Sequence, residues 1–372
     1  MDHVELTPRE LLGEGFAAPH VTDAPWVVRW DRVRGDVGEL VLKSLPEVVE
    51  FSTSGTTGAP RTWSRTREYL WAEAGMLAGL LAPGRPGAAV SFVPPSHLYG
   101  ALSSVLVPAH LGVPAWYRPG FAGAMPPVEQ DRCAVMAIPW IFSLLLRHLP
   151  WVRDREHVGV LHASGMLPSS AADFLRAADG RGEIVEVFGS TESGGVATRR
   201  WTRGEPPDWE LFPDVEFARS TPDTPDDEVP LAVRSPRIAF QDDGRAPESW
   251  ELDDFVEVLD DRRFRFTGRR SRIVNLNGRR LNLDVLEDAA RRVLDVADLA
   301  LQPVADAMIG EHVELLVVPR PGQRLGDLDL SAAIDRMGVR PRRVRDVEHI
   351  DRTELGKFRR VQRPTNHAGA DA

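Results

Sequence analysis

The 372-residue sequence has a single cysteine, Cys133, so an intrachain disulfide framework is excluded and a reducing compartment is expected. It also has no excess of positive charge. Its 45 lysine and arginine residues are outnumbered by 55 aspartate and glutamate residues, which gives a formal net charge of −10. Nucleic-acid binding depends on basic groups that neutralise phosphates. We therefore expect neither a disulfide scaffold nor a nucleic-acid partner.

Long apolar runs are also missing. The longest, over residues 133–146, is shorter than the roughly 20 residues that a transmembrane helix needs, and it contains Pro139. We expect a buried strand over 133–138 and then a helix that starts near Pro139. The N-terminal Met-Asp-His-Val-Glu has neither the basic nor the apolar region of a secretory signal. The sequence therefore predicts a cytoplasmic protein without membrane insertion.

Strand and helix patterns alternate over the first 190 residues. We expect helices over 67–81, 102–111 and 169–178. We expect strands over 46–51, 88–93, 113–117, 133–138, 158–163 and 184–188. Such alternation predicts an α/β domain whose sheet is mainly parallel.

The character of the sequence changes after about residue 205. Proline, aspartate and glutamate are dense over 205–228, and short alternating runs then predict a β-rich subdomain that extends to about 267. A connector over 268–272 follows. The rest has the pattern of a small α+β domain. We therefore expect a large domain over 1–267, a hinge over 268–272 and a small, mobile C-terminal domain over 273–372.

The small domain contains one strongly amphipathic segment, over 283–294. Asn282 is a suitable N-cap for this helix, and Asp284 favours its N-terminus. Its apolar face is expected to contain Val285, Leu286, Ala289, Ala290, Val293 and Leu294.

The segment Phe51–Arg61 gathers hydroxyls, small residues and backbone N–H donors directly after an apolar strand. Gly55 and Gly58 permit the positive φ at which successive amides converge on an anion. The segment is not a GxxxxGK[ST] loop, because no lysine followed by serine or threonine comes after the second glycine. Alone, such a cluster is also typical of a solvated turn. Three further segments, however, fit the same chemistry.

The second segment is Val187–Gly195, where a strand ends in an aromatic residue, hydroxyls and the carboxylate of Glu192. The third is Phe264–Arg280, and the fourth is Glu354–Arg360. Together with the loop, these segments resemble the acyl-adenylate-forming (AMP-binding) superfamily, which includes acyl- and aryl-CoA ligases. The resemblance covers about residues 46–362, and it is to compact members with a short N-terminal region.

The sequence departs from the family pattern at three motif positions. The usual lysine of the loop is Arg61, which keeps the charge. Leu252-Asp-Asp254 stands in place of Thr-Gly-Asp, and the hinge position, usually aspartate or lysine, is Ser271. The resemblance implies that the small domain rotates about Ser271 between two half-reactions.

The resemblance implies a ligase that uses ATP, Mg²⁺ and coenzyme A. It would adenylate a small carboxylic acid, with an aryl or conjugated acid as our expectation, and then form a thioester with coenzyme A. Transfer to the thiol of a separate carrier protein or to an amine is the alternative. A non-catalytic nucleotide-binding protein with the same fold is the alternative from another functional class.

Roles at the nucleotide site follow from the same resemblance. Glu192 would bind Mg²⁺, a hard cation that takes one or two carboxylates plus phosphate oxygens. Thr191 would donate to the α-phosphate. Phe188 would offer a face to adenine, with core packing as the alternative. The cofactor-binding residues expected in the large domain and connector are Thr53, Ser54, Gly55, Thr56, Thr57, Gly58, Arg61, Ser164, Gly165, Phe188, Gly189, Ser190, Asp254 and Arg269.

Asp254 is expected to accept hydrogen bonds from both ribose hydroxyls, with Asp253 as the alternative. Lys357 would neutralise charge between the attacking carboxylate and the α-phosphate, although a lysine near a C-terminus is also typical of a solvated charge. Gly278 would line the tunnel for pantetheine, and Arg280 would meet phosphates. The expected catalytic residues are Lys357, Thr191, Glu192 and His97.

His97 falls where relatives place a gating aromatic residue or histidine at the acid pocket. A purely structural histidine is the alternative interpretation at this position.

Overall fold

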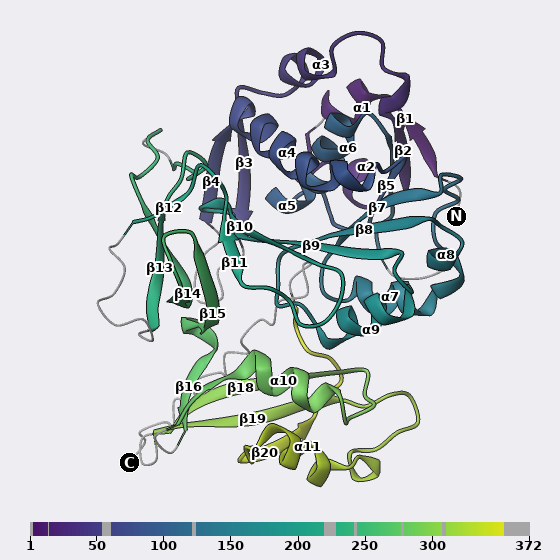
Figure 1. The fold of residues 1–372 in the computed structure, drawn as a ribbon. Helices are drawn as coiled ribbons and strands as arrows, with labels where there is room; N and C mark the ends of the chain where they lie inside the picture. The colour runs from purple at the N-terminus through teal and green to yellow at the C-terminus, as the bar shows by residue number, and fades with distance from the viewer. Residues whose placement is uncertain are drawn as a thin grey trace, which may run out of the picture. The chain divides into compact units, whose positions relative to one another are not determined.

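The computed structural model describes residues 3–13, 15–53, 61–120, 124–218, 228–241, 244–276, 279–306 and 310–352. Figure 1 shows the elements that they form. The chain divides into two compact units, and the boundary along the described chain falls between Arg272 and Ile273. Each unit is described by itself. Seven predicted site residues lie outside the described residues: Ser54, Gly55, Thr56, Thr57, Gly58, Gly278 and Lys357.

The first unit contains most of the strands. These are β1 (Val4–Leu6), β2 (Trp26–Arg29), β3 (Val48–Thr53), β4 (Arg61–Thr66), β5 (Ala88–Ser91), β6 (Pro114–Tyr117), β7 (Arg132–Ala137), β8 (His157–His162), β9 (Gly182–Ser190), β10 (Gly194–Trp201), β11 (Trp209–Leu211), β12 (Glu216–Phe217), β13 (Glu228–Arg234), β14 (Trp250–Val258) and β15 (Arg263–Arg269). Its α-helices are α1 (Pro8–Gly13), α2 (Pro19–Thr22), α3 (Val37–Ser44), α4 (Arg67–Leu81), α5 (Leu98–Gly100), α6 (Val107–Leu111), α7 (Ile141–Arg147), α8 (Leu149–Arg153) and α9 (Ser169–Ala177).

Thirteen of the described strands form one sheet, in the order β1-β2-β6-β5-β7-β8-β9-β10-β11-β15-β14-β13-β12. The strands from β6 to β9 run parallel to one another. From β9 to β12 each strand is antiparallel to its neighbour. The predicted α/β class with a β-rich part is therefore confirmed. The β-rich part continues the parallel sheet through the β9–β10 hairpin instead of forming a sheet of its own.

The parallel strands are buried on both faces, which explains their nearly continuous apolar sequence. Every residue of β7 except the first is buried, and the same holds for β8. Helices α4 and α6 lie on one side of these strands, and α7 and α9 lie on the other (Figure 1). This arrangement leaves the strand ends, and not the strand faces, open for a ligand.

The helix predicted over 67–81 is confirmed by α4, which is capped by the Thr66 side chain. The helix predicted over 102–111 differs, because residues 101–106 form a π-helical segment before α6. Pro108 has no N–H to donate within a helix. In addition, the Ser104 hydroxyl donates to the Val93 carbonyl oxygen at 2.7 Å, which ties this segment to the loop after β5. Both features favour a local departure from α-helical geometry.

Gly100 makes the closest backbone approach in this region. A Cβ at this position would lie 1.7 Å from the Pro94 carbonyl oxygen. We expect Gly100→Ala to lower the free energy of unfolding by about 2–3 kcal/mol, because the loop backbone must move. The matched control is Gly79→Ala in α4, where a Cβ meets no atom within 4 Å. That change should be neutral or stabilise by up to about 1 kcal/mol. Urea unfolding of both variants measures the difference, and equal stabilities would contradict it.

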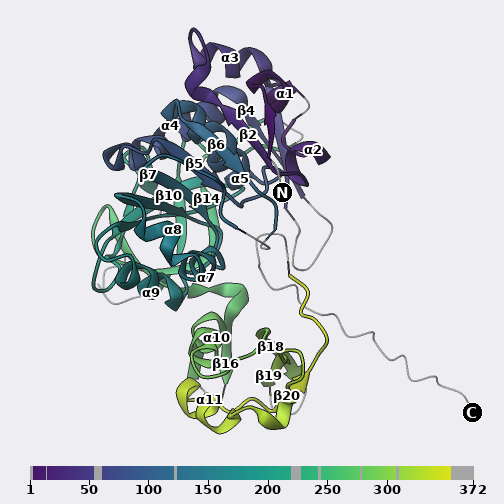
Figure 2. The same cartoon turned by 90° about the vertical axis from the view of Figure 1, so that its right-hand side faces the viewer.

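The second unit has five described strands and two described α-helices. They are β16 (Ile273–Leu276), β17 (Arg279–Asn282), α10 (Leu283–Arg291), β18 (Asp298–Asp306), β19 (Gly310–Val318), α11 (Leu330–Met337) and β20 (Arg343–Asp346). Strands β18, β19 and β20 form one sheet, and α10 and α11 pack on one side of it (Figure 2).

The predicted N-cap of α10 is confirmed, since the Asn282 side chain accepts a hydrogen bond from the Asp284 N–H at 2.9 Å. The helix ends at Arg291, three residues earlier than predicted. Val285 and Val293 are exposed, so their predicted place on the apolar face was wrong. The buried stripe contains Leu283, Leu286 and Ala290, whose spacing of three and four residues faces β18 and β19.

Candidate functional site

The turn between β9 and β10 carries Thr191 and Glu192. It is closed by two serines: the Ser190 N–H donates to Ser193 Oγ at 3.2 Å, and the Ser193 N–H donates to Ser190 Oγ at 3.1 Å. Both serine side chains are therefore committed to the turn itself. Thr191 and Glu192, at its tip, are partly exposed. The predicted Ser190 thus has a structural partner, while the two predicted catalytic residues remain accessible.

Two glycines make this tight hairpin possible. A Cβ at Gly189 would lie 2.1 Å from the Gly194 carbonyl oxygen, so only glycine fits there. Gly194 itself has φ +68°, a left-handed conformation that favours glycine. The Gly-Ser-Thr-Glu-Ser-Gly pattern is therefore explained by backbone geometry as well as by its polar side chains.

Beneath the turn lies a group of buried charges that was not predicted from the sequence. Arg65 of β4 donates from Nη2 to the Thr191 carbonyl oxygen at 2.8 Å. Glu73 of α4 accepts the Gly195 N–H at 2.7 Å. Arg237, in the loop after β13, donates to the Gly195 carbonyl oxygen from Nε at 3.1 Å and from Nη2 at 2.9 Å. One sequence signal was available: Glu73 is a carboxylate within the buried stripe of α4.

The Glu192 carboxylate lies at the tip of the turn and is partly exposed. Its backbone is held, because its carbonyl oxygen accepts the Ala239 N–H at 2.7 Å. Among the described residues, none donates a hydrogen bond to its side chain or forms an ion pair with it within 4 Å, while the buried Arg65 interacts with it electrostatically. The described residues also contain no group of three metal-binding side chains. A single carboxylate completed by phosphate oxygens fits Mg²⁺, which rarely needs an all-protein cage.

The carboxyl ends of the parallel strands place other predicted residues at the same edge as this turn. Ser164 and Gly165 follow β8, two residues after the register pair of His162 with Glu186, and thus level with Phe188 on β9. Ser164 has φ +72°, which is uncommon for a residue with a side chain and typical of functional loops.

His97 follows β5 and precedes α5. The chain connects β5 to β6 on one side and then to β7 on the other, so the strand order reverses at β5. In open α/β sheets, ligands bind outside the carboxyl ends of the strands at such a reversal. Tyr99 anchors α5 at this edge by donating to the Leu161 carbonyl oxygen at 2.6 Å, and burial raises its pKa. His97 is half-buried, and its role at an acid pocket remains a prediction.

Phe188 lies in an aromatic cluster. Its ring centroid is 5.3 Å from that of Trp209, 5.7 Å from Phe264 and 6.0 Å from Phe266. The side chain is only partly buried, so packing and a face for adenine are compatible with each other.

Asp254 and Arg269 are brought together as register partners on β14 and β15. Arg269 Nε lies 3.2 Å from Asp254 Oδ1. Asp254 is 7% exposed, whereas Asp253 points to the exposed face of the strand. The sequence left open which of these two carboxylates would hold the ribose. The structure distinguishes them, because Asp254 is buried and paired with Arg269 whereas Asp253 is exposed.

The remaining described site residues lie on two hairpins. Thr53 and Arg61 are register partners at the ends of β3 and β4, and the Thr53 hydroxyl donates to the Arg61 carbonyl oxygen at 3.4 Å. Arg61 is thus the first residue of a strand. Arg280 lies on β17, paired with Asn275.

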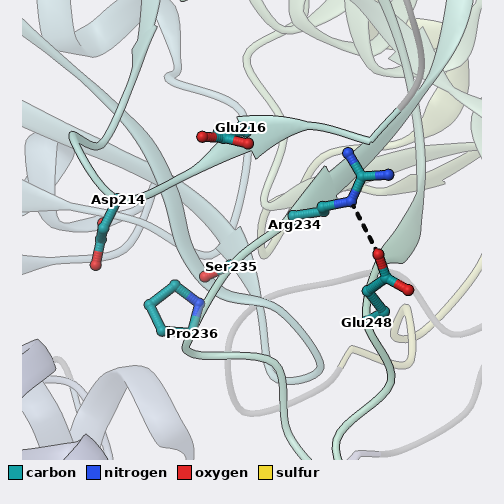
Figure 3. Close-up of a pocket in the computed structure, with 6 residues that line it drawn as sticks. All are labelled: Asp214, Glu216, Arg234, Ser235, Pro236 and Glu248. Atoms are coloured by element: carbon teal, nitrogen blue, oxygen red, sulfur yellow. Dashed lines mark ion pairs between the residues drawn. The ribbon is translucent and has the colours of Figure 1, made fainter.

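A cavity of about 320 Å³ lies elsewhere, on the antiparallel part of the sheet (Figure 3). Arg234 and Glu248 point toward each other across it, with Nε 3.4 Å from Oε1. It is shallow, and its wall includes Asp214, the ion-pair partner of Arg237. We do not assign the predicted site to this cavity. No helix among the described residues is long and apolar enough to cross a membrane.

Residues 51–222 match the model of the AMP-binding enzyme family. The 4-coumarate–CoA ligase of Halorhodospira halophila is 26% identical over 238 residues, which are 60% of this chain and 56% of the relative. The 4-coumarate–CoA ligase of Rhodobacter capsulatus is 33% identical over 193 residues, 47% of this chain and 46% of the relative. The chain thus spans about half the length of these curated relatives.

Solved structures agree on the fold. The anthranilate CoA ligase AuaEII in complex with anthranoyl-AMP has a TM-score of 0.65 at 16% identity, covering 83% of this chain and 65% of that one. The McyG A-PCP structure with phenylalanyl-adenylate has a TM-score of 0.66 at 15% identity, covering 83% and 64%. The family match over residues 51–222 confirms the resemblance to the AMP-binding family that was predicted from the sequence, and the solved structures share the fold.

Proposed function

We propose that the chain is an ATP-dependent acid–thiol ligase that adenylates a carboxylic acid and then transfers the acyl group to coenzyme A. The observation that carries this proposal is the Thr191–Glu192 turn. It combines a hydroxyl and an accessible carboxylate at the ligand-binding edge of a parallel sheet, within the segment that matches the family. Among the described residues, no hydrogen bond or ion pair within 4 Å engages this carboxylate, which leaves it available for a ligand.

The first half-reaction requires stabilisation of negative charge. A carboxylate oxygen of the acid attacks the α-phosphorus of ATP, the bond to the bridging oxygen breaks, and pyrophosphate leaves with the electron pair. Thr191 would donate to the α-phosphate, and Lys357 would offset charge between the acid and that phosphate. Mg²⁺ bound at Glu192 would supply Lewis-acid stabilisation of the phosphate oxygens.

The second half-reaction transfers the acyl group. The thiolate sulfur of coenzyme A attacks the acyl carbon, the bond to the phosphate oxygen breaks, and AMP leaves. Asp254, oriented by Arg269, would hold the ribose in both steps. Gly278 and Arg280 would contact the thiol partner after rotation of the small unit.

We expect the acid to be an aryl or conjugated carboxylic acid. Relatives include proteins named for 4-coumarate, and a 24%-identical relative from Streptomyces sp is named salicylyl-CoA synthase / salicylate adenylyltransferase. A panel of aryl and aliphatic acids in a pyrophosphate-release assay tests this choice. Preference for aliphatic acids would contradict it.

The acceptor is tested separately. Coenzyme A, a carrier protein bearing phosphopantetheine, and simple amines are each added to the enzyme with ATP and the preferred acid. We expect AMP release to be fastest with coenzyme A. A higher rate with either other acceptor would replace coenzyme A in the proposal, and no acid-dependent turnover at all would favour a nucleotide-binding protein without catalysis.

We further propose that the 268–272 connector is a hinge between two bodies. Its arginines and glycine link the two compact units at Arg272 and Ile273. Limited trypsin digestion should cleave near residues 268–272, and ATP with the acid should slow that cleavage. Cleavage confined to residues 205–228, with no effect of ligands on the connector, would contradict the hinge.

A further inference from the structure

We propose that Arg65, Glu73 and Arg237 are positioning residues that hold the Thr191–Gly195 turn, and thereby Glu192, in the shape needed to bind metal–nucleotide. The proposal rests on the proposed role of Glu192. It adds three charged residues from β4, α4 and the loop after β13, which act through the turn.

The three residues are almost completely buried, with exposed fractions of 2% for Arg65, 3% for Glu73 and 5% for Arg237. They contact one another as well as the turn. Arg65 Nη1 donates to the Arg237 carbonyl oxygen and lies 3.7 Å from Glu73 Oε2. Three segments that are distant in the sequence therefore converge beneath one short turn.

The contacts are made to the backbone of Thr191 and of Gly195, on either side of Glu192. Arg65 holds the carbonyl of Thr191, Glu73 holds the N–H of Gly195, and Arg237 holds the carbonyl of Gly195. Glu192 lies between these anchors. The backbone on both sides of Glu192 is therefore held by charge-assisted hydrogen bonds, which are among the stronger kinds in proteins.

Glycine at positions 194 and 195 lets the network reach the backbone. A Cβ at Gly194 would lie 3.1 Å from Glu73 Oε1 and 2.9 Å from Arg237 Cβ. A Cβ at Gly195 would lie 3.1 Å from the Phe212 ring and 3.4 Å from the same Glu73 oxygen. Gly194 therefore leaves the space that Glu73 and Arg237 occupy, while Gly195 leaves space for Phe212 as well as for Glu73.

A network of buried charges is not the arrangement that best serves packing alone. Among the described residues, Arg65 Nε and Glu73 Oε2 are buried without a hydrogen-bond partner. Well-packed apolar residues often replace a buried ion pair without loss of stability. Burial lowers the pKa of the Arg65 guanidinium, while the carboxylates of Glu73 and Glu192 raise it. The charge of Arg65 is thus coupled electrostatically to Glu192.

The test uses conservative variants of the full chain: Glu73→Gln, Arg65→Lys and Arg237→Lys. Each variant keeps the approximate size of the side chain. Glu73→Gln removes the carboxylate charge, and the two lysine variants remove the planar guanidinium with its several N–H donors. The matched control is Arg155→Lys. Arg155 is 6% exposed and also donates to backbone carbonyls, those of Val128 and Trp151, away from the turn.

The first measurement is hydrogen–deuterium exchange of the ligand-free protein, resolved to peptides covering residues 188–197. We expect roughly tenfold faster exchange there in Glu73→Gln and Arg65→Lys, but wild-type exchange in Arg155→Lys, because the held amide lies in this segment. Unchanged exchange in every network variant that folds would overturn the proposal. This measurement does not depend on catalysis.

The second measurement is the Mg²⁺ concentration that half-saturates acid-dependent pyrophosphate release. Partners that orient a metal ligand typically change metal affinity 10- to 100-fold, so we expect a rise of about tenfold or more in the network variants. A purely structural role would lower thermal stability and leave the Mg²⁺ dependence unchanged, and that result would overturn the proposal. If wild-type protein releases no pyrophosphate, the proposed function fails, while the exchange measurement still decides whether the network holds the turn.

Discussion

Glu192→Gln is expected to lower acid-dependent pyrophosphate release by about a thousandfold or more, the upper part of the range for removal of a preorganised electrostatic group. Glutamine has nearly the same shape but no charge. It would leave a metal ion and several phosphate charges without their protein carboxylate. Steady-state pyrophosphate release at saturating ATP and acid measures the effect.

The fold should not change in this variant. The described contacts of Glu192 within the large unit use its backbone, through the hydrogen bond from Ala239 N–H. Glu39→Gln is a suitable control, since Glu39 is an exposed carboxylate on α3 that pairs with Lys43 at 2.7 Å. The control should keep wild-type activity. Near-normal turnover of Glu192→Gln at ordinary Mg²⁺ concentrations would remove Glu192 from the metal site.

Lys357→Ala is expected to slow adenylation by on the order of a hundredfold or more. The cationic side chain would act only while charge develops between the acid and the α-phosphate. Transfer from a preformed acyl-adenylate to coenzyme A should be nearly unaffected, because the small unit would have rotated by then. Single-turnover measurements of the two half-reactions separate these effects.

The matched control for this prediction is Arg359→Ala, which removes the same charge two residues further along the chain. Both positions lie in the polar sequence Glu354–Arg360, so we expect each variant to change the free energy of unfolding by no more than about 0.5 kcal/mol. Equal losses in both half-reactions would contradict the alternation of the small unit. No loss in either would exclude Lys357 from catalysis.

The elements that could be predicted from the sequence are those specified by local patterns. Helix α4 was predicted with its observed bounds from its helical pattern alone, and the structure adds the cap at Thr66. The parallel strands were predictable because burial on both faces produces continuous apolar runs. The π-helical segment at 101–106 could not be predicted in this way, since it depends on the contact between Ser104 and Val93 in addition to Pro108.

The same distinction between local sequence patterns and contacts between distant segments holds at the candidate site. The Thr191–Glu192 turn was identified because all its residues are adjacent in the sequence. Its supporting network was missed because its contacts join distant segments: 122 residues separate Glu73 from Gly195, and 172 separate Arg65 from Arg237. A buried arginine in a strand has no local signature. The pairing of Asp254 with Arg269 was likewise set by the register of β14 and β15, which residue patterns alone do not specify.

The central claim is that this chain forms acyl-adenylates, and acid-dependent ATP–pyrophosphate exchange tests it most directly. Purified protein is incubated with ATP, Mg²⁺, labelled pyrophosphate and a panel of carboxylic acids, without coenzyme A. We predict that label enters ATP only when a suitable acid is present, and that Glu192→Gln abolishes this exchange. Exchange that is independent of acid, or absent with every acid while ATP still binds, would contradict the claim.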